Sequence, residues 1–288
     1  MNKSIFRAIL FITFAVALAG CCYSPVSNSE RTNKNSKPGL TNKDKAIAVI
    51  KSYETGDASV LEKYVSADTF IQHNLDSPDG RQPMIDAYNS GMHATVDIRR
   101  VFADGDYVVL HTKYGMPDGS EGFLAVFDVF RFENGLIAEH WDNIQNYREP
   151  NPSGHTMLDG PTEASDIEKT GENKKLVSNL LNKVFISGDS ASMASCFDGD
   201  NYIQHNPDIG DGLSALTDEI LGTMDYLKVH YILGDGNFVL AMSEGTLNGS
   251  PTAFYDLFRV ENGYIAEHWD VIQEIPPEEK WANANGKF

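Results

Sequence analysis

The sequence predicts an α+β fold of two tandem, cone-shaped half-barrels, each a curved and mostly antiparallel sheet wrapped around three helices. The main observation is a repeat: Glu133–Asp142, with the sequence ENGLIAEHWD, returns almost unchanged as Glu261–Asp270, with the sequence ENGYIAEHWD. A second block agrees, because Ile71–Asn74 returns as Ile203–Asn206 and an Asp-x-x-Asp-Gly turn follows in both places. In each copy, helical periodicity comes first and strand patterns follow. The chain therefore contains two copies of one unit.

Each copy is expected to open with an amphipathic helix. Four apolar residues of the first copy fall at the helical spacing i, i+3, i+4 and i+7, namely Ala46, Val49, Ile50 and Tyr53. Thr41 precedes them and is placed to cap the start of the helix. A short second helix, a strand that ends in the Ile-Gln-His-Asn block and a third helix are expected next.

Asp-Gly and Asn-Gly dipeptides divide the rest of each copy into a meander of about four long strands. They stand at 104–105, 118–119 and 134–135 in the first copy, and at 235–236, 248–249 and 262–263 in the second. A curved sheet wrapped around helices leaves a cavity between the two layers. That cavity is where a ligand site is expected.

The net charge and the N-terminal sequence limit which kinds of partner the chain is expected to bind. The chain has 288 residues and a net charge of −18, which repels nucleic acid and anionic lipid, so neither is an expected partner. Lys3 and Arg7 accompany an apolar run too short to span a bilayer, which indicates a targeting signal. Leu18–Cys21 resembles the bacterial lipobox, in which the signal is cut before a cysteine that is then lipidated. An ordinary secretory signal cut nearby is the alternative.

These features predict a protein that is secreted through its signal peptide and anchored by lipid, at the periplasmic face of the outer membrane or at the cell surface. Acyl chains rather than a spanning helix would provide the membrane contact. The predicted segments are a lipoprotein signal peptide over 1–20, a flexible tether with lipidated Cys21 over 21–41, a first domain over 42–148, a linker over 149–172, a second domain over 173–276 and a C-terminal tail over 277–288.

Polar residues on the last two strands of each copy are the leading site candidates. Side chains alternate along a strand, so His140 and Asp142 share one face and Trp141 takes the other. The Asn134–Gly135 hairpin brings the preceding strand alongside, which places Asp128 on the same expected cavity wall. Two carboxylates beside an imidazole suit proton transfer, although a satisfied polar network on an exposed sheet face is the alternative. The corresponding residues of the second copy are Asp256, His268 and Asp270.

His73 and His205 end the first strand of each copy, where we expect the mouth of the cavity. Trp141 and Trp269, on the opposite sheet face, are expected to pack one sheet against the other. A metal held by His73, His140 and one aspartate is a weaker alternative. The sequence contains no glycine-rich phosphate loop and no cysteine pair with metal spacing, and we expect neither a metal nor an organic cofactor.

At these residues the chain resembles the SnoaL-like polyketide cyclases, and within them a bacterial group predicted to catalyse aldol condensation. These proteins belong to the nuclear transport factor two-like superfamily. The resemblance rests on Tyr202–Asn206, Tyr255–Arg259 and Gly263–Asp270, and it covers residues 46–147 and 174–276. It implies the cone-shaped fold, chemistry without a cofactor, and a dimer that the two copies would reproduce within one chain.

The resemblance also implies roles for single residues. Asp128 matches a ketosteroid isomerase aspartate that an apolar site keeps protonated, so that it donates to an oxyanion. His73 and His205 take the place of that family's aspartate base. The oxyanion tyrosine of the isomerases would fall near Val49 and Leu181, so that half of their site is missing here.

We therefore expect proton abstraction next to a carbonyl on a small apolar or cyclic substrate. His73 or His140 would act as base, Asp142 would orient the imidazole, and Asp128 would donate to the developing enolate. The rival expectation is a non-catalytic module that binds a small ligand or a protein at the cell envelope. The two copies are expected to pair sheet to sheet as an internal pseudo-dimer, with a homodimer of chains as a further alternative.

Overall fold

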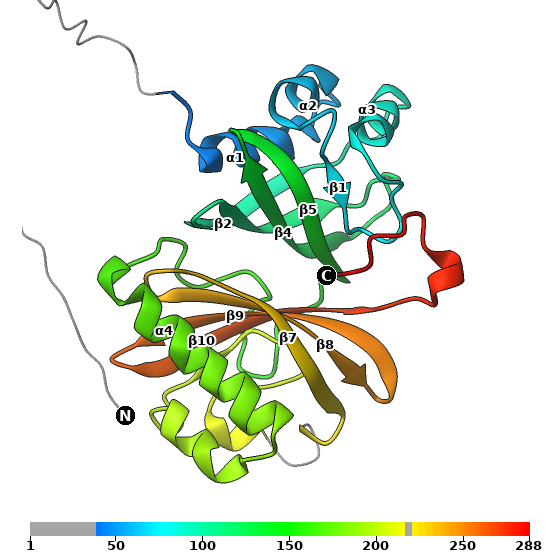
Figure 1. Ribbon diagram of the computed structural model, residues 1–288. Coiled ribbons are helices and arrows are strands. Elements are labelled where there is room, and N and C mark those ends of the chain that lie inside the picture. The colour runs from blue at the N-terminus through cyan, green and yellow to red at the C-terminus, as the bar shows by residue number, and fades with distance from the viewer. Residues whose placement is uncertain (1–38, 217–220) are drawn as a thin grey trace, which may run out of the picture. The chain divides into compact units, whose positions relative to one another are not determined.

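Two five-stranded sheets with helical segments beside them make up the described part of the protein (Figure 1). The computed structural model describes residues 39–216 and 221–288. The expected signal peptide over 1–20, the lipidated Cys21 and most of the tether lie outside these residues. The observed fold class is mixed α+β. Within the described ranges, no helix is both long enough and apolar enough to cross a bilayer.

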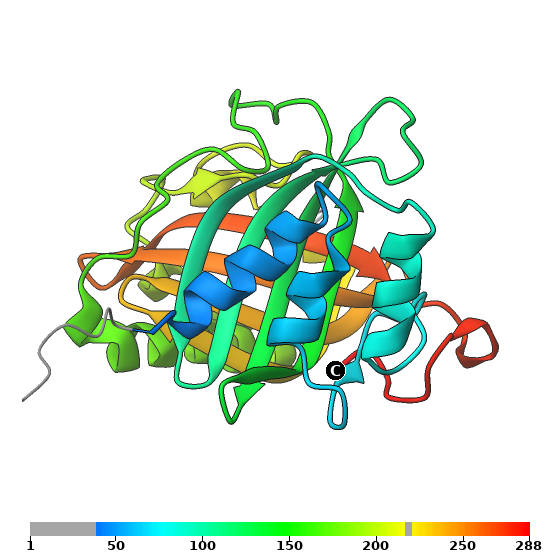
Figure 2. The same ribbon diagram turned by 90° about the horizontal axis from the view of Figure 1, so that it is seen from above.

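The N-terminal half, described from residue 39 onward, has the strand order β1-β5-β4-β3-β2. β1 pairs in parallel with β5, and the other neighbours are antiparallel. The helices lie over one face of this sheet (Figure 2). The elements are α1 (Asn42–Ser52), α2 (Ala58–Tyr64), β1 (Ile71–Gln72), α3 (Arg81–Asn89), β2 (Val96–Asp104), β3 (Tyr107–Gly115), β4 (Phe123–Glu133) and β5 (Leu136–Asn146).

α1 begins after Thr41, and the predicted cap is confirmed. The Thr41 hydroxyl accepts a hydrogen bond from the Asp44 backbone N–H at 3.2 Å, and the Asp44 carboxylate accepts from the Thr41 N–H at 2.8 Å. This capping box pairs two N–H groups that the first helical turn leaves free. Ala46, Val49 and Ile50 are buried in the core that α1 shares with the sheet. α1 thus supplies apolar cover for the sheet face on which the site lies.

The C-terminal half has the matching strand order β6-β10-β9-β8-β7. Its second expected helix is a 3-10 segment over Ser190–Cys196, because serine hydroxyls there bond to nearby groups, Ser195 to the Ser192 carbonyl among them. Part of the third expected helix falls on residues 217–220, outside the described residues. The elements are α4 (Thr170–Asn179) continuing as a π-helical segment (Leu180–Ile186), β6 (Ile203–Gln204), β7 (Met224–Asp235), β8 (Phe238–Leu247), β9 (Ser250–Glu261) and β10 (Tyr264–Glu274).

The turn at Asn134 and Gly135 joins β4 to β5, and an irregularity between Arg131 and Phe132 then shifts the register of the two strands by one residue. Both residues have positive φ, 51° and 78°, and a tight hairpin needs this conformation to match the twist of its strands. Asp128 then pairs with Asp142 across the two strands. The turn and this register shift together therefore decide which side chains of the two strands meet.

The two sheets share one apolar core. Trp141 of β5 and Trp269 of β10 are fully buried in it, together with residues of both sheets such as Phe102, Phe127 and Tyr255. Side chains alternate along β5 and β10, so this core lies on the face opposite to His140 and His268, which precede the two tryptophans. Each sheet is consequently covered on both faces.

Two reciprocal hydrogen bonds connect the last strands of the two halves. The Ile144 N–H donates to Gln273 Oε1, and the Ile272 N–H donates to Gln145 Oε1, both at 3.0 Å. Each glutamine thus satisfies a partly buried backbone donor of the other half, and leaving such a donor unpaired would cost free energy. The contact fixes β5 and β10 relative to each other.

Two segments outside the sheets cross from one half to the other. The linker strap, residues 149–161, follows β5, and the Asn151 side chain donates to a carbonyl of β6 at 2.6 Å. The C-terminal strap, residues 275–288, follows β10, and the Asn285 side chain donates to a carbonyl of β1 at 3.0 Å. Each strap therefore binds the short parallel strand of the opposite half.

Arg100 of β2 is buried between the two sheets and the linker strap. Its guanidinium donates to the carbonyl oxygens of Pro161 at 2.7 Å, Leu158 at 3.3 Å and Asp159. It also lies over the ring of Trp269, 4.0 Å from the centroid. A buried guanidinium is costly unless it is fully paired, and these contacts supply the pairing.

We expect Arg100→Leu to lower the free energy of unfolding by about 2–4 kcal/mol, because the carbonyl groups of Leu158 and Pro161 lose their donor inside the protein. The adjacent Arg99→Ala is the control, since Arg99 is exposed and pairs only with exposed Asp97 at 2.7 Å. That change should cost less than about 1 kcal/mol. Urea denaturation measures both. Equal losses would contradict the role given to Arg100.

Candidate functional site

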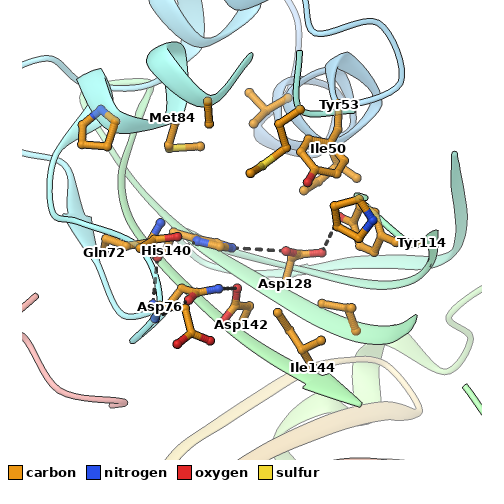
Figure 3. Close-up of a pocket in the computed structure, with 18 of the residues that line it drawn as sticks. Ile50, Tyr53, Gln72, Asp76, Met84, Tyr114, Asp128, His140, Asp142 and Ile144 are labelled. Carbon is orange, nitrogen blue, oxygen red and sulfur yellow. Dashed lines mark hydrogen bonds and ion pairs between the residues drawn. The ribbon is translucent and has the colours of Figure 1, made fainter. Parts of the chain in front are cut away.

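A cavity of about 360 Å³ lies between the helices and the sheet of the N-terminal half (Figure 3). Its wall is mainly apolar and includes Ile50 of α1, Met84 of α3 and Ile144 of β5. None of its described lining residues is a lysine or an arginine. The volume is at the small end of the range for ligand pockets. The polar residues of the wall are Gln72, Asn74, Asp76, Ser77, Asp128, His140 and Asp142, with Tyr53, Tyr88 and Tyr114.

Asp128 of β4 and Asp142 of β5 stand directly opposite each other on the cavity wall. Both are buried, and like charges in this arrangement repel. His140 lies two residues before Asp142 on the same face, with its Nε2 3.2 Å from Asp128 Oδ1. The sheet register therefore gathers Asp128, His140 and Asp142 at one place.

Gln72 of β1 determines which nitrogen of His140 carries a proton. Gln72 Oε1 accepts the Asn74 backbone N–H at 2.9 Å, which identifies that atom as the acceptor of the amide. His140 Nδ1 lies 2.9 Å from the same oxygen and must donate to it. The Nε2 atom thus faces Asp128 with a lone pair until a second proton arrives. The contact between His140 and Asp128 is a hydrogen bond only when one proton is shared between them.

Tyr114 of β3 supplies a phenol that the sequence analysis missed. Its hydroxyl donates to Asp128 Oδ2 at 2.8 Å, and burial next to the Asp128 charge raises the pKa of Tyr114 well above its ordinary value. Burial also raises the pKa of Asp128, against the opposing effect of His140. The resemblance would place such a phenol near Val49 of α1, whereas the structure supplies it from β3. Strand alternation, which puts Tyr114 on the same core face as Leu110, is the signal that could have located it.

Asp142 does not orient the imidazole of His140, so this expectation is wrong. Among the described residues no hydrogen bond joins Asp142 to His140, and Gln72 of β1 alongside supplies the orienting contact instead. Asp142 Oδ2 accepts from Asn74 Nδ2 at 2.6 Å, and Oδ1 lies 3.7 Å from the ammonium of Lys287. Lys287 is buried and donates to the Asp142 carbonyl oxygen at 2.7 Å. The C-terminal strap therefore brings a cation to this wall.

His73 and His205 do not line the cavities, and their expected place at the mouth is wrong. Side chains alternate along a strand, so His73 points away from the face to which Gln72 contributes. Its Nε2 is 2.9 Å from Glu139 Oε1, and its ring stacks on Trp141 with centroids 4.8 Å apart. His205 makes the corresponding contacts in the C-terminal half. The metal set that would combine His73 with cavity residues is thus not brought together.

The C-terminal half repeats the polar cluster with a different phenol. Asp256 stands opposite Asp270, and His268 Nε2 is 3.2 Å from Asp256 Oδ1. Tyr226 of β7 lies 3.2 Å from both carboxylate oxygens of Asp256. Burial raises the pKa of Asp270 to about 6. The cavity that the described residues leave beside this cluster is about 50 Å³, against about 360 Å³ in the N-terminal half.

In the comparison with known proteins, residues 46–140 match the family model described as a SnoaL-like domain. No curated protein matches the chain. Among solved structures, TsrD from Streptomyces laurentii is 18% identical over 37% of this chain and 91% of its own, with a TM-score of 0.32. A protein from Bacillus cereus, provisionally assigned as a polyketide cyclase, is 19% identical over 38% of this chain and 81% of its own, with a TM-score of 0.32. An NTF2-like protein from Cytophaga hutchinsonii is 17% identical over 38% and 95%, with a TM-score of 0.33.

We expect Gln72→Leu to release the fixed tautomer of His140, because the acceptor for Nδ1–H is lost. Long-range proton–nitrogen NMR of the two ring nitrogens measures this directly. In the unchanged protein Nδ1 should carry the proton, and in the variant the proton should distribute between both nitrogens. The matched control is Gln204→Leu, which should alter His268 and leave His140 unchanged. An unaltered His140 spectrum in Gln72→Leu would refute the assignment.

Proposed function

We propose that the N-terminal half is an acid/base catalyst that removes a proton next to a carbonyl group of a small, largely apolar substrate. Aldol, cyclase, isomerase and dehydratase reactions can all begin with this step. One observation carries the proposal. On the wall of an apolar cavity, buried His140 and Asp128 lie so that one proton can be shared between His140 Nε2 and Asp128 Oδ1. The SnoaL-like domain match over 46–140 is consistent with chemistry of this type.

The pair acts as base in its proton-poor form, with His140 neutral and Asp128 ionised. A proton leaves the substrate carbon and comes to rest between Nε2 and Oδ1, while the C–H electron pair forms the enolate. Burial raises the pKa of Asp128, which favours the protonated pair over an exposed carboxylate in water. We therefore expect the rate to rise with pH through a midpoint above the ordinary value for aspartate.

Tyr114 is the proposed donor to the enolate oxygen. Its hydroxyl lies on the cavity wall and bonds to Asp128 in the resting protein. When the pair takes up a proton, the negative charge of Asp128 is removed and this hydrogen bond weakens. The phenol can then turn to the oxygen on which charge develops, as an oxyanion donor does. Its raised pKa keeps it protonated for that role.

The charges of the site favour a neutral substrate. Asp76, Asp128 and Asp142 contribute to the cavity wall, and no lysine or arginine is among its described residues. The ammonium of Lys287 lies behind Asp142 and is occupied by a carbonyl and by Gln273. A carboxylate or phosphate substrate would therefore meet negative charge without a compensating cation.

The proposed domain arrangement and cellular location are those that the sequence predicts. We propose two tandem SnoaL-like half-barrels over 42–148 and 173–276, paired sheet to sheet within one chain, and anchored through lipid on Cys21 at the periplasmic face of the outer membrane or the cell surface. The shared core and the reciprocal Gln145 and Gln273 contacts support the pairing. The chemistry proposed for the N-terminal half needs no organic cofactor.

Deuterium exchange tests the chemistry without knowledge of the product. Small ketones and cyclic diketones are incubated with the protein in D₂O, and NMR follows loss of the proton next to the carbonyl. Asp128→Asn and His140→Gln should each reduce the exchange rate by about 10²–10⁴-fold, the range for loss of a positioned acid or base. The matched changes Asp256→Asn and His268→Gln should leave it within about twofold, since the small C-terminal cavity excludes these compounds.

Two results would overturn the catalytic proposal. One is exchange that persists in Asp128→Asn and His140→Gln. The other is a compound that raises the melting temperature and contacts the cavity without any exchange, which would assign the cavity to the non-catalytic binding module. Tyr53, also on the wall, offers a site for a blocking change that should abolish both binding and exchange.

Lipid attachment has its own test. Cys21→Ser should abolish incorporation of labelled fatty acid and move the protein from the membrane fraction to the soluble fraction, because the acyl chains provide the membrane affinity. Cys22→Ser is the adjacent control and should retain both properties. Labelling that survives in Cys21→Ser would show that the predicted lipobox is wrong.

A further inference from the structure

The cluster of Asp256, His268 and Asp270 has no role in the chemistry proposed for the other half. Each residue is more than nine-tenths buried, and one ligand atom from each lies within 4.8 Å of the other two. The adjacent cavity of about 50 Å³ is lined by His268 and Asp270. This space suits a few water molecules rather than an organic substrate.

The nitrogen of His268 that faces the cluster carries a lone pair. Gln204 Oε1 accepts the Asn206 N–H at 2.9 Å, which identifies it as an acceptor, and His268 Nδ1 lies 3.0 Å from it and must donate. Nε2 then points at Asp256 Oδ1 across 3.2 Å. Two lone pairs at this distance repel, so a proton or a metal cation belongs between them. A histidine held through its other N–H is also the usual arrangement of a metal ligand.

The hydrogen bonding of Asp270 is a second, separate observation that indicates a cation site. Its Oδ2 accepts from Asn206 Nδ2 at 2.7 Å, whereas Oδ1 is buried and has no hydrogen-bond partner among the described residues. In the part of the chain that the structure describes, no lysine or arginine forms an ion pair with Asp270. A buried carboxylate oxygen without a partner is costly unless a positive group balances it.

The two straps explain why only one half has a built-in cation. The C-terminal strap places a carbonyl oxygen 2.9 Å from His73 Nδ1, and the residue that follows is Lys287, whose ammonium reaches Asp142. The linker strap places a carbonyl oxygen 2.7 Å from His205 Nδ1, and the residue that follows is Met157, which is buried and uncharged. Equivalent positions of the two straps thus hold a lysine beside the N-terminal half and a methionine beside the C-terminal half.

We propose that Asp256, His268 and Asp270 together bind one divalent first-row transition-metal ion. One imidazole nitrogen and two carboxylate oxygens form a donor set that suits zinc, iron(II) or manganese, and the imidazole disfavours calcium and magnesium. Water from the adjacent cavity completes the coordination. The ion supplies the positive charge that Lys287 supplies in the N-terminal half, so the N-terminal cluster does not bind one.

Metal titration of the full chain tests the site. The protein is treated with EDTA and titrated with Co²⁺, followed by its visible absorption, and with Zn²⁺ by calorimetry. We expect one ion per chain, and Asp270→Asn and His268→Gln should each weaken binding by at least about tenfold. The matched changes Asp142→Asn and His140→Gln should leave stoichiometry and affinity unchanged.

Circular dichroism first shows that each variant is folded. Should Asp270→Asn not fold, His268→Gln and the NMR shift of His268 Nε2 on addition of Zn²⁺ to the unchanged protein take its place. The proposal fails if the protein retains no ion, or if folded Asp270→Asn binds as tightly as the unchanged chain. It also fails if His155→Gln removes binding, since His155, Asp159 and His205 form the other candidate metal group among the described residues.

Discussion

Two aspartates face each other across neighbouring strands in each sheet, Asp128 with Asp142 and Asp256 with Asp270. Like charges at such a position destabilise a sheet, and burial strengthens their repulsion. The other polar groups of the site offset this repulsion. An imidazole and a phenol contact one carboxylate, and an asparagine amide donates to the other. In the N-terminal half Lys287 adds a full positive charge. The arrangement of the site therefore follows from one unfavourable cross-strand pair.

The two halves differ in the aromatic packing around the site rather than in the polar cluster itself. In the C-terminal half, Phe254 and Phe185 stack on Tyr226 with centroids 4.6 and 5.2 Å apart. In the N-terminal half the smaller Val126 lines the cavity, and Tyr114 reaches Asp128 from the adjacent strand. Similar polar groups thus stand beside an open cavity in one half and a nearly filled one in the other. A repeated motif is consequently weak evidence for a repeated activity.

Strand alternation and turn chemistry made much of the N-terminal half predictable. The shared face of His140 and Asp142 follows from a period of two along the strand, which is visible in the sequence. The pairing of Asp128 with Asp142 also depends on the register shift between Arg131 and Phe132, for which the turn residues give no signal. The same period places His73 and Gln72 on opposite faces. The expectation for His73 failed because it rested on the position of this residue at the end of the strand and not on the face that its side chain takes.

Other contacts of the site could not be predicted from the sequence. Lys287 and Asp142 are far apart along the chain, and only the path of the C-terminal strap brings them together. Tyr226 contacts its aspartate from a different strand position than Tyr114 does, so comparing the two copies could not reveal it. The short second helix expected in the C-terminal half is a 3-10 segment over Ser190–Cys196, where local serine hydrogen bonds compete with a regular α-helix. Contacts that depend on long connections have no periodic signal.

The shared core between the sheets has a consequence for biosynthesis. A ribosome makes the N-terminal half first, so its sheet can form while the strands that cover Trp141 do not yet exist. During that interval an apolar sheet face is open to the solvent, a condition that favours wrong association between nascent chains. The wall behind Asp142 also lacks its cation until the C-terminal strap has been synthesised. Maturation of the first site therefore waits for the translation of the second half.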